Sequence, residues 1–304
     1  MADNSYFVTV RVPATSANLG PGYDALGLAL HLYDEYTFRR GDEARVRMEG
    51  EATGEAPTGA ENLALRAALL LAERQGATFD YLNVEEKSAI PVSRGLGASG
   101  AGVVAGLIAA NHVLGNILTT RELAALAIEI EGHPDNVLPA LVGGLVVVAA
   151  TGAEAEWVKI DCPPSLRVAL AVPELRITTS AAREVLPERV AFGDAIHNVS
   201  RVGLLVAAVQ NDRLDLLGTA MDDRLHQPYR RRLHPALNEM LAAAREAGAL
   251  GAALSGSGST VIALCDGDAQ PAATAMRQAC EEAGIECWDS VCMPSSTGAT
   301  IVSK

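Results

Sequence analysis

Gly95, Gly97 and Ser99 form the segment of this sequence whose residue types and spacing point most directly to chemistry. They stand between an expected strand that ends at Ala89 and an Ala-, Val- and Leu-rich helix that ends near Leu114. A strand, a Gly-x-Gly loop and a helix together offer backbone N–H groups and the positive end of a helix dipole to an anion. Glycines let the backbone approach phosphates closely, and the Ser99 hydroxyl can reach a phosphate-bound Mg²⁺. The segment is therefore a candidate phosphate-binding loop.

The same loop also has a purely structural interpretation. A tight strand-to-helix turn with Ser99 as the helix N-cap would use the same residues. The loop is not a GxxxxGK[ST] P-loop, because no lysine follows the glycines, and it lacks the third glycine of a dinucleotide fingerprint. Taken alone, the loop is equally compatible with a phosphate site and with a capped turn.

Hydrophobic periodicity and capping signals predict the elements around this loop. The first half is expected to contain helices at 62–75, from the glycine loop to about 114, and from 119 or 120 to about 131, with strands at 7–12, 26–39, 44–51, 81–89 and 143–150. A Gly- and Pro-rich loop is expected at 13–22, directly after the first strand. The second half is expected to contain helices at 195–210, 212–221, 235–247 and 270–283, with strands at 166–172, 249–254, 260–265 and 287–293. A small, polar stretch at 151–155 predicts two domains, residues 1–155 and 156–304.

The composition fits a mixed α and β globular enzyme. The chain has 304 residues, of which 49 % are hydrophobic and only 4 % aromatic, so it can bury two cores of ordinary size. With 24 basic and 37 acidic side chains, its net charge of −13 repels nucleic acid and anionic lipid. The same charge repels ATP, so a nucleotide site must depend on local backbone amides, a helix end and Mg²⁺.

The cysteines and apolar stretches indicate a cytoplasmic protein that binds no membrane. The five cysteines are odd in number and include no CxxC pair, which predicts reduced thiols in place of disulfides or a zinc site. The first twelve residues are polar or strand-like, without a signal-peptide pattern. The apolar stretches at 101–118 and 137–150 are interrupted by polar residues, proline or glycine, so neither predicts a membrane span.

Three motifs in order resemble those of the GHMP kinase superfamily, which includes galactokinase and the homoserine and mevalonate kinases. PVSRGLGASGA at 91–101 resembles the PxxxGLGSSAA phosphate loop, PATSANLGPGYDALGL at 13–28 the N-terminal motif, and GAALSGSGST at 251–260 the C-terminal glycine motif. The resemblance spans most of the chain. It implies a two-domain α+β GHMP kinase fold, with a first domain like domain 2 of ribosomal protein S5 and a ferredoxin-like second domain.

Within the superfamily, the sequence resembles the homoserine kinase branch. The PxTSANLGPGxD form of the N-terminal motif, EGHPDNVLPALVGG at 131–144, QPYR at 227–230 and the Thr179-x-x-x-Arg183 spacing all agree with that branch. This implies ATP-dependent phosphorylation of the L-homoserine hydroxyl, a step in threonine biosynthesis.

The resemblance also implies a nucleotide and Mg²⁺ site. ATP would contact the loop residues Pro91, Val92, Ser93, Arg94, Gly95, Leu96, Gly97, Ala98, Ser99, Gly100 and Ala101. Mg²⁺ would be held by Ser99 and by a glutamate, either Glu129 or Glu131, of which Glu131 is favoured; residues two apart cannot share one helix face. The loop departs from the family pattern, since Ala98 stands where many members have the first serine.

The implied substrate site has a partner for each polar group of homoserine. Asp24 and Asn18 would receive the ammonium group, and the forked guanidinium groups of Arg183 and Arg230 the carboxylate. The remaining expected contacts are His133, Asp135, Asn136, Thr179, Gly256 and Gly258.

The catalytic group is then Ser99, Glu131, Asp135 and Asn136, with Asp135 or Asn136 orienting the hydroxyl. No general base is assigned, because phosphoryl transfer depends mainly on positioning and electrostatic stabilisation.

Two other functions stay open at this point. The chain could be another GHMP kinase, of the mevalonate-pathway or sugar type, whose substrate has no ammonium group for Asp24. It could also be a non-catalytic member that only binds ligand, although the intact loop, Ser99 and Glu131 argue against this. A homodimer is left open.

Overall fold

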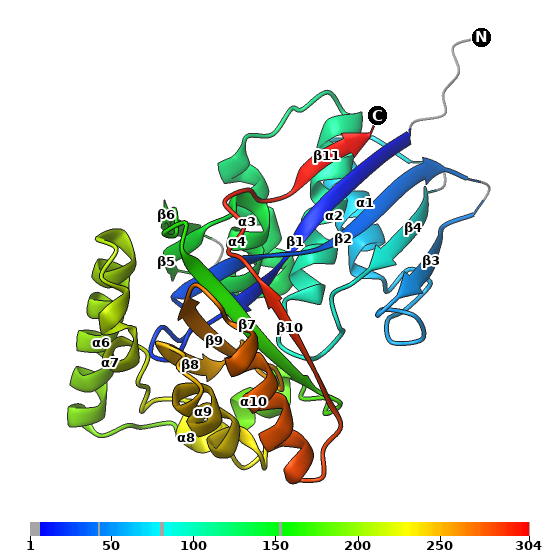
Figure 1. Ribbon diagram of the computed structural model, residues 1–304. Coiled ribbons are helices and arrows are strands. Elements are labelled where there is room, and N and C mark those ends of the chain that lie inside the picture. The colour runs from blue at the N-terminus through cyan, green and yellow to red at the C-terminus, as the bar shows by residue number, and fades with distance from the viewer. Residues whose placement is uncertain (1–6, 42, 80–81, 152–153, 304) are drawn as a thin grey trace.

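The larger of two β-sheets carries the N-terminal half of the molecule (Figure 1). The computed structural model describes residues 7–41, 43–79, 82–151 and 154–303. The larger sheet has the order β11-β1-β2-β4-β3, and β5 pairs with β2 and with β6. Its strands are β1 (Phe7–Ala17), β2 (Leu26–Arg40), β3 (Arg45–Gly50), β4 (Leu82–Ser88), β5 (Leu145–Thr151), β6 (Glu154–Ile160) and β11 (Thr300–Ser303). Among the described strands, only β3 and β4 form a parallel pair.

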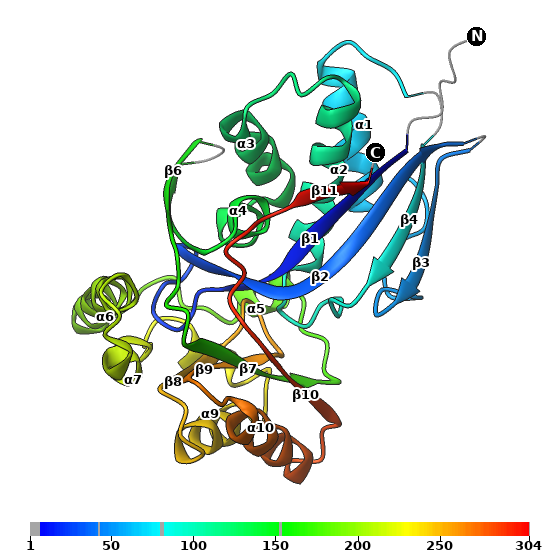
Figure 2. The ribbon, with the colours of Figure 1, turned by 45° about the horizontal axis from the view of Figure 1, so that its top comes forward.

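Four helices cover one face of this sheet (Figure 2). They are α1 (Leu63–Arg74), α2 (Ala98–Val113), α3 (Thr120–Glu131) and α4 (Pro134–Val142). Asn62 caps α1 through its side chain, and a Thr119–Glu122 capping box starts α3, which confirms both predicted helix starts. Helix α2 is buried along most of its length because it packs against α1, α3 and α4 as well as β1. Its N-terminus is therefore held firmly in place.

The smaller sheet confirms the expected ferredoxin-like arrangement. Its antiparallel strands have the order β10-β7-β9-β8, and α9 and α10 pack on its outer face. The elements are β7 (Leu166–Pro173), α9 (Leu237–Glu246), β8 (Gly251–Leu254), β9 (Val261–Asp266), α10 (Gln270–Glu282) and β10 (Cys287–Cys292). This βαββαβ order is the split βαβ motif of ferredoxin-like folds.

The connection between β7 and α9 contains five further helical elements, of which α6 is the longest. They are α5 (Thr179–Glu184), α6 (Phe192–Gln210), a 3₁₀ turn (Leu214–Leu216), α7 (Leu217–Ala220) and α8 (Gln227–Arg230). Helices α6 and α7 stand to one side of both sheets in the two views. The single helix predicted for 212–221 is wrong, because the 3₁₀ turn and α7 divide this segment.

Several elements differ from the sequence prediction for identifiable reasons. Strand β1 continues to Ala17, where a loop was predicted from Pro13, because a register shift between Pro13 and Ala14 accommodates the proline. Helix α4 was not predicted; Pro134, read as an interruption, occupies its first turn, where proline is tolerated. Residue 81, at the start of one predicted strand, lies outside the described residues.

The alternating side chains of β7 belong to two cores. Val168, Leu170 and Val172 join the core beneath the larger sheet, whereas Ala169 and Ala171 face the core under α9 and α10. The predicted division after residue 155 stays a prediction; β6, which spans that point, and β11, which lies beyond it, both pair within the larger sheet. No helix among the described residues is long and apolar enough to cross a membrane.

Candidate active site

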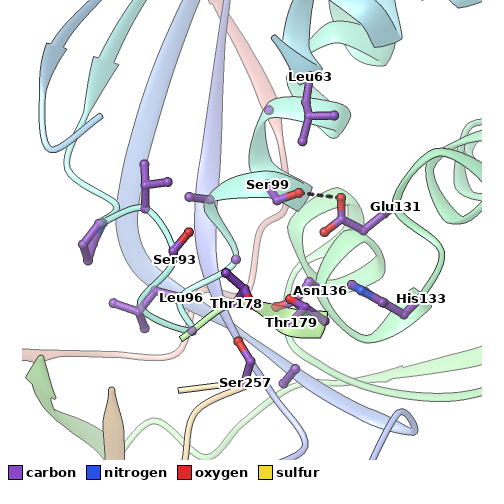
Figure 3. Close-up of a pocket in the computed structure, with 18 of the residues that line it drawn as sticks. Leu63, Ser93, Leu96, Ser99, Glu131, His133, Asn136, Thr178, Thr179 and Ser257 are labelled. Atoms are coloured by element: carbon purple, nitrogen blue, oxygen red, sulfur yellow. Dashed lines mark hydrogen bonds between the residues drawn. The ribbon is translucent and has the colours of Figure 1, made fainter. Parts of the chain in front are cut away.

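A pocket of about 450 Å³ lies between the two sheets at the N-terminus of α2. Figure 3 shows Ser93, Leu96 and Ser99 from the glycine loop on one side and Glu131, His133 and Asn136 on another. Thr178, Thr179 and Ser257 reach the same pocket from the second half of the chain. The pocket is thus built by segments far apart in the sequence.

Three loops are joined by hydrogen bonds at the base of this pocket. The backbone N–H of Thr15 donates to the carbonyl of Leu96 at 3.0 Å. The N–H of Gly256 donates to the Ala17 carbonyl at 3.1 Å, and the Ser255 hydroxyl donates to the Gly95 carbonyl at 2.7 Å. The C-terminal glycine motif therefore braces the phosphate loop.

The glycines of the loop are required by close contacts as well as by backbone angles. Gly95 has φ +81°, and a Cβ there would lie 2.2 Å from the Ser255 carbonyl oxygen. Gly97 is the N-cap of α2 with φ 76°, and no described side chain caps the helix. The alternative role of Ser99 as N-cap is therefore wrong. The start of α2 is free of a side-chain cap at the pocket, which suits an anion.

The Ser99 side chain contacts a carboxylate. Its hydroxyl donates to Glu131 Oε2 at 2.7 Å (Figure 3). Burial raises the pKa of Glu131, although the hydrogen bond from Ser99 lowers it in part. Glu129, the alternative metal ligand, instead accepts from Arg74 Nη1 at 2.9 Å and does not line the pocket. Of the two glutamates, Glu131 is the one beside the loop.

The oxygen pair of Ser99 and Glu131 fits Mg²⁺. This ion keeps several waters and commonly takes one or two protein oxygens together with substrate phosphates. Across the described part of the chain, no three His, Cys, Asp or Glu side chains cluster so that they could hold a metal ion together. A metal held mostly by phosphates and water is compatible with that finding.

Asp24, Arg183 and Arg230 gather at the other end of the pocket. Arg183 Nη1 and Nη2 donate to the two carboxylate oxygens of Asp24 at 3.0 and 2.8 Å. Arg230 is only 3 % exposed and donates through Nη1 to the Gly256 carbonyl at 2.8 Å. The Tyr23 ring lies 5.5 Å from the Arg183 guanidinium carbon and 5.2 Å from that of Arg230. Two cations and one anion therefore face one small volume.

Asn18 has a structural role in this cluster. Its Nδ2 donates to the Gly256 carbonyl at 2.9 Å, and its Oδ1 accepts from the Asp24 backbone N–H at 3.1 Å. Asn18 adopts φ 72°, which asparagine tolerates better than most residues. It lines the pocket as predicted, and its amide already fixes Asp24 to the glycine motif.

Asp135 lies between these two ends of the pocket. Its side chain is almost fully buried, and this burial, followed by the charge of Asp24, raises its pKa to about 7. His133 Nδ1 lies 3.8 Å from Asp135 Oδ1, and burial lowers the pKa of His133. Asn136 Oδ1 accepts from the Thr15 hydroxyl at 2.8 Å. Helix α4 thus presents three polar residues to the pocket from its first turn and N-cap.

Comparison with known proteins identifies the family. The GHMP kinase N-terminal domain profile matches residues 62–144, and the GHMP kinase C-terminal profile matches residues 205–282. A homoserine kinase of Moorella thermoacetica is 45 % identical over 96 % of this chain and 99 % of that protein. The chain belongs to the homoserine kinases of the GHMP kinase family.

Other homoserine kinases agree with this assignment. The protein from Deinococcus radiodurans is 44 % identical over 85 % of this chain and 84 % of its own length. A crystal structure of homoserine kinase from Cytophaga hutchinsonii has a TM-score of 0.88 and 32 % identity, and covers 99 % of this chain and 98 % of its own. An L. major mevalonate kinase shares the fold, with a TM-score of 0.70 at 19 % identity, covering 96 % of this chain and 97 % of its own.

Four residues predicted to contact nucleotide or substrate do not line the pocket: Arg94, Gly100, Ala101 and Gly258. Gly100 and Ala101 are buried within α2. The Arg94 side chain turns toward the smaller sheet, where its Nε donates to the Pro173 carbonyl at 3.1 Å and Nη2 to Glu174 at 2.7 Å. These residues pack against or hydrogen-bond to neighbouring segments and do not face the pocket.

Some pocket residues of this homoserine kinase family member were missed by sequence reasoning. They include Tyr36, Glu55, Asn62, Glu86, Ile177, Thr178 and Ser257. Asn62 was noticed only as a helix start. For Glu86 a signal existed. It lies two residues after the buried Val84 in β4 and therefore on the same face of the strand, so an acidic side chain points inward.

Proposed function

We propose that this chain transfers the γ-phosphoryl group of ATP to the side-chain hydroxyl of L-homoserine, giving O-phospho-L-homoserine and ADP. The observation that carries the proposal is the pairing, within one pocket, of an uncapped glycine-loop helix with a cluster of Asp24, Arg183 and Arg230. The first feature suits phosphates, and the second suits an α-amino acid with charged ends. The reaction belongs to threonine biosynthesis.

The nucleotide phosphates are proposed to bind the backbone of residues 95–99. Ser99 and Glu131, whose oxygens lie 2.7 Å apart, would hold a Mg²⁺ ion between them and the phosphates. When bound, Mg²⁺ neutralises charge on the phosphate oxygens as phosphoryl transfer proceeds. The backbone amides of the loop and the bound Mg²⁺ would attract the phosphates locally, although the net charge of the chain repels them.

The substrate is proposed to bind at the far end of the pocket. Arg230 and Arg183 would take the carboxylate, and Asp24 would take the ammonium group. Asp24 and Arg183 pair with each other through two hydrogen bonds. A zwitterionic substrate can exchange with this pair, because it brings one partner for each residue.

Asp135 and Asn136 are proposed to orient the hydroxyl between the two ends. The hydroxyl oxygen forms a bond to the γ-phosphorus, the bond from that phosphorus to the bridging oxygen of ADP breaks, and the hydroxyl proton passes to an oxygen of the transferred phosphoryl group. With a pKa raised to about 7, Asp135 is partly protonated near neutrality and can act as donor or acceptor of a hydrogen bond. Positioning of the hydroxyl needs no more than this.

The test is Mg²⁺-dependent release of ADP by the purified protein with homoserine, serine, mevalonate and galactose as acceptors. We expect turnover with homoserine and at least about 10⁴-fold lower kcat/KM with mevalonate or galactose, which leave buried polar groups unpaired. Preference for mevalonate or galactose would contradict the substrate assignment. ATP binding without turnover on any acceptor would contradict a catalytic role. The cytoplasmic location and the homodimer stay predictions.

A further inference from the structure

A buried hydrogen-bond network lies behind Arg230, outside the lining of the pocket. Its members are Asn198 of α6, Asp223 in the following loop and His226 at the N-cap of α8, each 8 % exposed or less. The network reaches from the N-terminal loop, residues 18–24, to the base of Arg230. Sequence reasoning singled out none of these three residues.

Asp223 fixes the start of α8. Its Oδ1 accepts from Asn198 Nδ2 at 2.7 Å and from the Leu225 N–H at 2.8 Å. Its Oδ2 accepts from the backbone N–H of His226 at 3.1 Å and of Gln227 at 2.7 Å. Burial opposes ionisation of Asp223, yet these hydrogen bonds hold its pKa below the usual value. Four donors thus hold a charged carboxylate in one orientation.

Asn198 extends the network to the N-terminal loop. Its Nδ2 also donates to the Pro21 carbonyl at 3.2 Å, and its Oδ1 accepts from the Arg224 N–H at 2.9 Å. A residue of α6 therefore links the motif at 13–28 to the segment that precedes α8.

His226 makes the second link and reaches Arg230 directly. Its Nε2 lies 2.6 Å from the Gly20 carbonyl oxygen, which can only accept, so Nε2 carries the hydrogen. In the neutral ring Nδ1 is then an acceptor, and Arg230 Nη1, which can only donate, lies 3.4 Å away. Burial lowers the pKa of His226, in agreement with a neutral ring. The imidazole is thus a fixed spacer between Gly20 and Arg230.

We propose that Asp223 and His226 are positioning residues that hold Arg230 and the 18–24 loop at a set separation, so that both charged ends of the substrate are bound together. The inference rests on the proposed function, in which Arg230 takes the carboxylate and Asp24 the ammonium group. Because the network touches only this end of the pocket, it should act on the amino acid and leave the nucleotide unaffected.

Two substitutions separate the hydrogen bonds of the imidazole to Gly20 and to Arg230. In His226→Gln the amide nitrogen can reach the position of Nε2 and donate to Gly20, but the acceptor for Arg230 is lost. In His226→Asn the amide oxygen can replace Nδ1 as the acceptor for Arg230, but the reach to Gly20 is lost. We expect each to raise the KM for homoserine roughly tenfold to a hundredfold, as misplacement by a remote substitution can do. The KM for ATP should change less than about twofold.

A matched control is His234→Gln. His234 is also fully buried, and its Nε2 lies 2.8 Å from the Ser259 carbonyl oxygen, but it makes no hydrogen bond to an arginine among the bonds described. We expect this control to lower the melting temperature like the His226 variants while leaving the KM for homoserine unchanged. Asp223→Asn, which removes one acceptor oxygen, provides a further variant should one His226 protein fail to fold.

The outcomes are distinguishable. Folded His226 and Asp223 variants with an unchanged homoserine KM, or with equal rises for homoserine and ATP, would overturn the inference. A wild-type protein that turns over ATP with no homoserine dependence would instead overturn the proposed function on which it rests.

Discussion

Ser99 and Glu131 are the residues whose removal should separate chemistry from folding. Ser99 is exposed and Glu131 is half-buried, and both substitutions keep the side chain close to its original size, so little packing is lost. We expect Ser99→Ala and Glu131→Gln each to lower kcat by about 10²- to 10³-fold, the size typical for a group that stabilises transition-state charge. The Mg²⁺ concentration for half-maximal activity should rise in both variants.

Glu129→Gln is the matched control, two residues away on the same helix. It removes an exposed ion pair with Arg74, which solvent screens and which therefore contributes little to stability. Activity and Mg²⁺ dependence should stay within about twofold of the wild type. Equal losses in Glu129→Gln and Glu131→Gln would show that neither glutamate is specific to the metal.

Ionisation of the buried Asp135 carboxyl should lower the stability of the folded protein, although the side chain is proposed to serve the reaction. In the unfolded chain its carboxyl loses the proton near pH 4, whereas burial and then Asp24 raise the folded-state pKa to about 7. Between these values the folded state binds more protons than the unfolded state, so the contribution of Asp135 to stability falls as pH rises. Asp135→Asn cannot ionise and should escape this loss.

Urea unfolding of wild type and Asp135→Asn at pH 4.5 and pH 8 measures the effect. The variant should gain up to about 3 kcal/mol relative to the wild type between the two pH values, since one pKa unit corresponds to about 1.4 kcal/mol. Asp34 and Glu86, whose pKa values burial also raises, are present in both proteins and cancel in the difference. A pH-independent difference would contradict the raised pKa. The turnover of Asp135→Asn should nevertheless fall.

At the scale of elements, the glycine loop must fit against the motif that braces it. Gly95→Ala adds strain at φ +81° and also forces a methyl group to within 2.2 Å of the Ser255 carbonyl, so the loop must shift. We expect the affinity for ATP, measured by calorimetry, to fall at least about tenfold, because a small displacement removes aligned donors.

Gly115→Ala tests strain without contact. Gly115 has φ +94° and follows the other end of α2, and no described atom lies within 4 Å of the place that an added methyl group would take. The substitution should cost about 1–2 kcal/mol of stability through backbone strain and leave ATP affinity unchanged. Similar losses of ATP affinity in both variants would mean that backbone strain at the ends of α2, and not the contact with Ser255, causes the loss.

The sequence predicted best those elements whose local signals agree with their tertiary environment. Helix α1, with Asn62 before a strongly patterned run, and α3, with its Thr119–Glu122 box, were predicted nearly to the residue. Helix α4 was missed because two prolines and a short length hide a helix that α2, α3 and the sheet stabilise from outside. Strand β11 has no local signal either, because its pairing with β1 joins the two ends of the chain.

The site divides in the same way. The phosphate loop and the 13–28 motif are contiguous segments, so pattern and resemblance could find them. The network of Asp223 and His226 could not be predicted, because it is defined by contacts with Gly20 and Arg230, and only folding brings Gly20 close to these residues. Arg94 was assigned to nucleotide because of its place in the loop, while its side chain points toward β7.

At the scale of the whole molecule, we expect the two halves to unfold together, because strand β7 contributes side chains to both cores. Its alternate side chains enter both cores, so neither core can be exposed without breaking the strand. Arg94 adds hydrogen bonds between the phosphate loop and the end of the same strand. A chain of this size with two independent units would instead show separate transitions.

The two tryptophans allow a direct test, because they lie in strands of different sheets and both pack against the core that β7 shares with the larger sheet. Trp157 lies in β6 opposite Val148, and Trp288 lies in β10 opposite Val172. In the single-tryptophan proteins Trp157→Phe and Trp288→Phe, fluorescence follows the surroundings of one strand, β10 or β6 respectively, during urea unfolding. We expect both to give a single transition whose midpoint coincides with that from circular dichroism of the same variant. A tryptophan signal that changes at lower urea than the helical signal would show that the sheets separate first. Substrate binding across the pocket would then have to supply the coupling that β7 does not.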